Sequence, residues 1–167
     1  MLWSAVMQPE HHMAFRITGL PAANFEPLFG LSDAELARRG VTRVVADQAP
    51  GFPDRVELRD AAPGETLLLL NYEHQPARNA YRASHAIFVR EGARASYNQI
   101  DAVPAVLRAR MISLRAFDAH DLMVDADLAD GRELEPAIER LLQRNDVAYL
   151  HAHYAKRGCY AARIERA

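Results

Sequence analysis

Cysteine and lysine are almost absent from this sequence. Cys159 is the single cysteine among 167 residues, which excludes an intramolecular disulfide and indicates a reducing compartment. Lys156 is the single lysine, so 19 of the 20 basic residues are arginine. With so much alanine, this bias is typical of a GC-rich genome. The functional alternative is that some guanidinium groups bind carboxylates or phosphates through paired hydrogen bonds, which lysine does not form.

The chain also lacks an excess of either charge and a long hydrophobic run. Its formal net charge of −2 argues against general binding to nucleic acid or to a membrane surface, since both need a basic excess. No apolar run approaches the roughly 18 residues that a membrane span needs. Residues 1–12 have neither the basic start nor the long apolar core of a signal peptide. We therefore expect a cytoplasmic protein without nucleic-acid or membrane partners.

Sequence motifs of the common nucleotide-binding and hydrolase families are missing too. There is no glycine-rich phosphate loop, no G-x-S-x-G, no C-x-x-C and no H-E-x-x-H. Residues 125–131, DADLADG, resemble a calcium-binding loop, but the third acidic residue comes one position late and Pro136 replaces the closing glutamate. No activity is therefore predicted from a motif alone.

The composition indicates one globular domain. Half of the residues are hydrophobic and 25% are charged, and a chain of this length buries a sizeable core. Residues 1–12 show no periodicity and contain Pro9, so we expect a loose N-terminal tail whose histidines are solvated. Residues 13–167 form the expected domain.

The expected fold class is α+β, a single compact domain with a mainly antiparallel sheet of about eight short strands and about three helices. Most connections are too short for a parallel crossover, which favours antiparallel pairing. Short apolar or β-branched runs between turns predict the strands, among them residues 15–20, 42–47, 56–60, 112–117 and 122–127.

The expected helices are short. Ser32, with Glu35 three residues later, forms a capping box that starts the first of them. Pro104 lies near the first turn of the second, over residues 103–110. An amphipathic run predicts the third, which ends at about Arg144.

Residues 66–91 are the stretch around which the rest of the chain is expected to be organised. Four consecutive leucines without period-two alternation predict a central strand over residues 66–72, buried on both faces. A second strand is expected over residues 84–90. Polar connections between rigid strands often carry binding groups. This connection supplies three candidate ligand-binding residues, His74, Arg82 and His85.

The last hairpin carries the second candidate group. A strand over residues 147–154 places His151 and His153 on one face, because side chains alternate along a strand. His-x-His on a strand is a common half-site for a metal ion, since both imidazoles converge on one ion. The structural alternative is a pair of partly buried histidines that hydrogen-bond to their neighbours. A cupin-like site needs an acidic residue shortly afterwards, where this chain has Lys156 and Arg157.

The turn before Cys159 decides which residues share the face of these histidines. A loop of two or four residues brings Tyr160, Ala162 and Ile164 to that face, whereas a three-residue loop brings Cys159 and Arg163 there. We favour the even loop, which adds Tyr160 to the candidate site. Cys159 itself lacks the surrounding signature of a nucleophile, and a small buried hydrophobic side chain is the favoured interpretation.

Three segments carry a resemblance to a known family: NYEHQP, YRASHAIFVRE and RGCYAARI. They are similar to a bacterial family designated domain of unknown function 1203. The resemblance covers nearly everything from Phe15 onward and implies a single domain of about this size. It implies no substrate, cofactor or catalytic residue.

Three functions are open from the sequence. The first is a small-molecule pocket, for binding or catalysis, with an anionic ligand favoured by the arginine content and anchored by Arg82 and Arg157. The second is a metal site in which His74 or His85 joins the His-x-His pair. The third is a protein–protein interaction domain in which the polar cluster is structural.

One spatial expectation follows from the first two functions. Polar and titratable groups are costly to bury unpaired, so they should gather around one cleft. At least two of the candidates should line that pocket: His74, Arg82, His85, His151, His153 and Tyr160. The substrate, reaction, cofactor and oligomeric state are not predicted.

Overall fold

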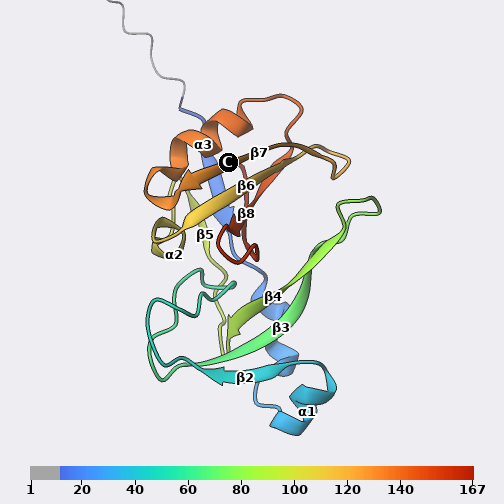
Figure 1. Cartoon of the computed structure of the whole chain (residues 1–167), viewed down its shortest axis with the longest axis vertical. Helices are drawn as coiled ribbons and strands as arrows, with labels where there is room; N and C mark the ends of the chain where they lie inside the picture. Colours follow the sequence, from blue (N-terminus) through green and yellow to red (C-terminus); the bar gives the residue numbers. More distant parts are fainter. Residues whose placement is uncertain (1–11) are drawn as a thin grey trace, which may run out of the picture.

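The computed structural model describes residues 12–167, which fold into two antiparallel sheets. The larger sheet has six strands in the order β5-β1-β9-β8-β6-β7, and the smaller has three in the order β2-β3-β4. The two sheets lie one beyond the other along the long axis of the molecule (Figure 1). The strands are β1 (Phe15–Thr18), β2 (Thr42–Val45), β3 (Thr66–Gln75), β4 (Ala83–Arg90), β5 (Asn98–Ile100), β6 (Met111–Phe117), β7 (Met123–Asp130), β8 (Tyr149–Tyr154) and β9 (Tyr160–Arg166).

The predicted α+β class with antiparallel pairing is confirmed, although the strands form two sheets where one was expected. The helices are α1 (Asp33–Arg38), α2 (Ala105–Arg108) and α3 (Leu134–Leu142), with single 3₁₀ turns at Ala22–Asn24, Glu26–Leu28 and Gly131–Glu133. The predicted capping box starts α1. The amide of Glu35 donates to Ser32 Oγ at 3.3 Å, and the amide of Ser32 donates to the Glu35 carboxylate at 2.8 Å.

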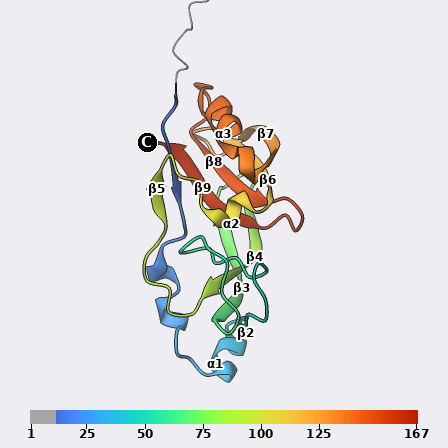
Figure 2. The same cartoon turned by 90° about the vertical axis from the view of Figure 1, so that its left-hand side faces the viewer.

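The main hydrophobic core lies between α3 and one face of the larger sheet. Leu114 of β6, Leu150 of β8 and Ile164 of β9 are fully buried on this face. Ile138 and Leu141 of α3 belong to the same core, because residues three apart lie on one side of a helix. Figure 2 shows α3 against the sheet from the side. The residues that alternate with these strand positions therefore lie on the opposite face.

The smaller sheet is built around β3, which pairs with β2 on one side and β4 on the other. Leu67 and Leu68 are fully buried, and Leu36 of α1 packs on Leu68. The expected central strand is therefore correct. It is also longer than expected, since β3 runs to Gln75 and β4 begins at Ala83. The long polar connection of the sequence prediction thus shrinks to residues 76–82, and His74 stands on a strand.

The predicted strand over residues 56–60 is wrong. The Asp54 carboxylate accepts hydrogen bonds from the amides of Glu57 at 2.6 Å and Arg90 at 2.7 Å, and Leu58 has a φ of 50°. A carboxylate that satisfies backbone amides competes with a strand ladder, so this segment forms a compact turn. Conversely, strand β5 was not predicted from the sequence. Its three residues are all exposed and carry no apolar alternation.

The β3–β4 hairpin reaches from the smaller sheet to the larger one (Figures 1 and 2). At its far end, Gln75 Nε2 donates a hydrogen bond of 2.8 Å to the Tyr149 hydroxyl of β8. This contact brings the end of β3 onto the sheet face that α3 leaves free.

The start of the described chain lies beside its end, since the amide of Ala167 donates to the carbonyl of Ala14 at 3.1 Å. His12 is exposed, and its ring nitrogens lie 3.0 Å from Asp101 and 3.1 Å from Glu139. The rest of the expected tail, residues 1–11, lies outside the described residues. Among residues 12–167, no helix has the length and apolar character needed to cross a membrane.

Candidate functional site

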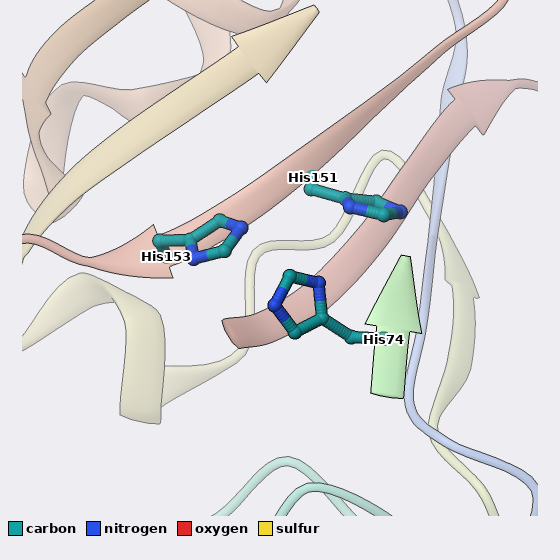
Figure 3. A group of neighbouring side chains, drawn as sticks. All are labelled: His74, His151 and His153. Atoms are coloured by element: carbon teal, nitrogen blue, oxygen red, sulfur yellow. The ribbon is translucent and has the colours of Figure 1, made fainter. Parts of the chain in front are cut away.

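Three histidines from two sheets meet on the face that α3 leaves free. β8 supplies His151 and His153, and β3 supplies His74 (Figure 3). The ring centroid of His74 lies 5.1 Å from that of His153 and 5.8 Å from that of His151. One ring nitrogen from each residue can be chosen so that all three lie within 4.8 Å of one another. We call these three residues the histidine cluster.

The histidine cluster is withdrawn from solvent and its hydrogen bonds are incomplete. His151 is 2% exposed and His153 is 1% exposed, while His74 is partly buried. Within residues 12–167, no partner is found for Nδ1 of His74, Nδ1 of His151 or Nε2 of His153. A buried polar atom left unsatisfied costs about 1–3 kcal/mol. Three such atoms in three neighbouring imidazoles therefore need an explanation beyond packing.

The hydrogen bond of His153 fixes its tautomer. Its Nδ1 lies 2.9 Å from the carbonyl oxygen of Gly158. A carbonyl only accepts, so Nδ1 carries the proton and Nε2 presents a lone pair. Metal-ligating histidines typically donate their second ring nitrogen to a carbonyl or carboxylate in this way. The turn between β8 and β9 thus fixes the ring of His153 and leaves its unprotonated Nε2 free to bind a ligand.

Burial keeps all three imidazoles neutral near pH 7. It lowers the pKa of His151 to about 2, that of His153 to about 3 and that of His74 to about 4. Repulsion from the charge of Arg115 is a further, smaller cause of the low pKa of each of the three histidines. A neutral imidazole offers a lone pair that an imidazolium lacks, so the cluster holds three nitrogen ligands without prior loss of a proton.

The β8–β9 register combines the two alternatives that the sequence left open. His153 pairs with Tyr160, as the even loop predicts, but a bulge follows and His151 pairs with Arg163. The expected placement of Ala162 and Ile164 beside the histidines is therefore wrong. The bulge shifts the strand by one residue, which lets Ile164 reach the α3 core while Tyr160 stays on the histidine face.

Tyr160 closes one side of the histidine cluster. Its ring stacks on His74, with centroids 5.0 Å apart and planes 11° apart, and meets His151 edge-on at 5.0 Å. Burial raises the pKa of its phenol well above the usual value. On the other side, the Tyr149 hydroxyl accepts from Gln75 and donates to Asp121 at 2.6 Å. These contacts hold the imidazoles between aromatic walls.

The other candidates from the polar connection lie outside the histidine cluster. His85 pairs with Tyr72 across β3 and β4, close enough to lower the pKa of His74, but it is not one of the clustered ligands. Arg82 forms an ion pair with Glu73 and its side chain is 68% exposed. Arg157 is exposed in the β8–β9 turn. The structure thus brings together His74, His151, His153 and Tyr160.

Arg115 is a site residue that the sequence reasoning missed. It lies directly opposite His151 in the β6–β8 register, so both side chains lie on the same face. It is partly buried, and desolvation lowers its pKa. The available signal was alternation, because Ser113, Arg115 and Phe117 interleave with the apolar core positions of β6.

Cys159 lies apart from the histidine cluster. It is 7% exposed, belongs to the main core, and its Sγ accepts a hydrogen bond of 3.2 Å from the buried Arg55. This position agrees with the interpretation of a small buried side chain.

A groove of about 370 Å³ runs beside the cluster. Two of its lining residues, Tyr160 and Arg163, pair with the cluster histidines in the β8–β9 ladder. Of the candidate site residues predicted from the sequence, Tyr160 alone lines this groove. The expectation that at least two candidates line one pocket therefore stays a prediction. Its lining residues are Thr18, Gly19, Leu20, Pro21, Ser96, Tyr97, Asn98, Tyr160 and Arg163.

Comparison with known proteins places the chain in a family. The sequence model of a protein family of unknown function, DUF1203, matches residues 51–166, which is more than two-thirds of the chain. The chain belongs to the DUF1203 family. The predicted resemblance is thereby confirmed, over a shorter stretch than the expected one from Phe15. The match includes the whole histidine cluster and Arg115, while no curated protein and no solved structure matches the chain.

Proposed function

We propose that this DUF1203 protein binds one transition-metal ion, with zinc the best fit, through His74, His151 and His153. The observation that carries the proposal is the set of three neutral imidazoles whose chosen nitrogens lie within 4.8 Å of one another. The buried, unpartnered Nε2 of His153 supports it further. A metal ion would satisfy these lone pairs, which hydrogen bonding within the described residues does not.

The donor set favours zinc over calcium or magnesium. Those two ions take oxygen ligands, whereas imidazole suits zinc, copper, nickel and iron. Three protein ligands with a position left open are typical of catalytic rather than structural zinc sites. At such a position zinc lowers the pKa of bound water to about 7, which supports hydrolysis or hydration of a small molecule.

Metal binding would draw the histidines closer together. In a tetrahedral site with Zn–N bonds of 2.0–2.1 Å, ligand nitrogens are about 3.3 Å apart. The clustered nitrogens lie within 4.8 Å of one another, so binding an ion requires their separations to shorten by up to about 1.5 Å. His74 lies one residue from the end of β3. Rotation of its side chain and a small movement of the hairpin can bring its nitrogen closer to the other two.

Two further properties complete the proposal. A single cysteine supports a cytoplasmic location, where thiols stay reduced. A pocket for a small anionic ligand, the leading expectation from the sequence, is compatible with the metal site because Arg115 lies beside it. The bacterial origin that the family resemblance implies is part of the same proposal.

Metal stoichiometry tests the proposed function. Protein stripped with a chelator and dialysed against Zn²⁺ should hold one zinc per chain by elemental analysis. His74→Ala, His151→Ala and His153→Ala should each abolish stoichiometric binding, because a site with three protein ligands rarely survives the loss of one. His85→Ala and His120→Ala are the matched controls and should retain one zinc.

Circular dichroism of each variant separates loss of a ligand from loss of the fold. A folded wild-type protein that takes up no zinc, copper, nickel or iron refutes the proposal. Full zinc binding by folded His151→Ala and His153→Ala refutes the assigned ligands.

A further inference from the structure

Arg115 lies beside the proposed metal site, and its guanidinium has no partner in the part of the chain that the structure describes. Other partly buried arginines are paired, as Arg43 is with Glu91, Arg90 with Glu57 and Arg110 with Asp60. Within residues 12–167, the guanidinium of Arg115 takes part in no hydrogen bond and no ion pair, although its backbone pairs with both neighbouring strands. Its five N–H groups form a planar fork that suits a carboxylate or phosphate.

The electrostatics of this face demand an anion once a metal is bound. The histidine cluster contributes three neutral ligands and no carboxylate. A divalent ion would therefore bring an uncompensated charge of about +2 next to the charge of Arg115. Two carboxylates near this face already have partners, since Asp121 accepts from Tyr149 and Glu165 pairs with Arg163.

The strand register places Arg115 so close to His151 that one small ligand can contact both the guanidinium and a metal ion bound by the histidine cluster. Side chains directly opposite in an antiparallel pair have Cβ atoms about 4.5–5.5 Å apart, and Arg115 is directly opposite His151. We propose that the open metal position takes an oxyanion, with one oxygen on the metal and another on the Arg115 guanidinium. The inference rests on the proposed metal site and adds the chemical class of its substrate, a small molecule with a carboxylate or phosphate group.

Cobalt provides a spectroscopic test. The Co²⁺-loaded protein is titrated with acetate, with inorganic phosphate and with acetamide, which is neutral but close to acetate in shape. Acetate or phosphate should change the visible absorption of Co²⁺ in a saturable way, and acetamide should not. The tighter of the two anions identifies whether the planar or the tetrahedral oxyanion is preferred, and either preference supports the proposal.

Variants at position 115 identify the anchor. Arg115→Gln should weaken oxyanion binding about 10- to 100-fold, as expected for a lost charge-assisted pair of hydrogen bonds, with Co²⁺ stoichiometry still one per chain. Arg115→Lys keeps the charge without the fork and should fall between Arg115→Gln and wild type. Arg82→Gln removes an exposed arginine outside the cluster and should leave oxyanion affinity within about twofold of wild type.

The outcomes separate this inference from the metal site on which it rests. Wild-type protein that binds no Co²⁺ overturns both. Stoichiometric Co²⁺ with no spectral response to either anion overturns the inference alone. A response of equal affinity in Arg115→Gln also overturns it, because Arg115 is then not the anchor.

Discussion

Acidification of the metal-free protein should reveal the cost of holding two imidazoles neutral in its interior. His151 and His153 are almost fully buried, and burial lowers their pKa values to about 2 and about 3. In the unfolded chain the pKa of each returns to about 6.5. Below pH 6.5 these two histidines therefore bind protons in the unfolded state but not in the folded state. The free energy of unfolding falls as the pH falls.

The magnitude follows from proton linkage. One pH unit between the two pKa values corresponds to about 1.36 kcal/mol for each group. From pH 7.5 to pH 5, each histidine should lower the free energy of unfolding by about 2 kcal/mol, so the pair lowers it by about 4 kcal/mol. The result is insensitive to the folded-state pKa values, provided that both lie below about 4. Carboxylates such as Glu65 and Asp130, with pKa values of about 2, lose their stabilising ionisation only at lower pH.

Urea unfolding followed by circular dichroism, in the presence of a chelator, measures this loss at pH 7.5 and pH 5. His153→Gln should reduce the difference by about 2 kcal/mol, and His120→Gln, at an exposed turn position, should leave it unchanged. A difference below about 1 kcal/mol in the wild type would refute the reasoning, since the buried imidazoles would then accept protons without penalty.

The remaining predictions concern packing and the hairpin. Leu68→Ala should cost about 2–5 kcal/mol in urea unfolding, because this fully buried side chain lies on central strand β3; a near-neutral value would contradict the core assignment. Gly131→Ala should cost about 2–4 kcal/mol, since a Cβ would collide with the Leu107 carbonyl, whereas Gly51→Ala meets only a flexible side chain at 3.3 Å and should cost under about 1 kcal/mol. Equal losses would argue against that collision. Zinc should slow amide hydrogen exchange around His74, and unchanged exchange with zinc bound would remove His74 from the ligand set.

The parts of the fold that were predictable depend on local sequence. The capping box of Ser32 and Glu35 and the His-x-His alternation each involve residues a few positions apart. Their geometry follows from helix and strand periodicity alone. The wrong strand over residues 56–60 shows the limit of this reasoning, because Asp54 satisfies backbone amides that a strand would have paired.

The assembled site depends on contacts between distant segments. His74 was a candidate, but its position beside His153 requires that β3 continue to Gln75 and that its hairpin reach the larger sheet. The bulge between Ala152 and His153 was not predicted, since it depends on the core that Ile164 must reach. Arg115 was missed because its importance comes from a strand neighbour and not from its own sequence context.

Because the histidine cluster is divided between two sheets, the distances between its nitrogens depend on how the two sheets are oriented. His74 travels with the β3–β4 hairpin, whereas His151 and His153 are fixed in the middle of the six-stranded sheet. A rotation of one sheet relative to the other would change the distance of His74 from His151 and His153. It would also disturb the buried cluster in which Ile87 and Val89 of β4 pack with Tyr160 of β9. An ion bound by all three histidines would hold the two sheets in one relative orientation. Its affinity would therefore depend on the angle between the sheets.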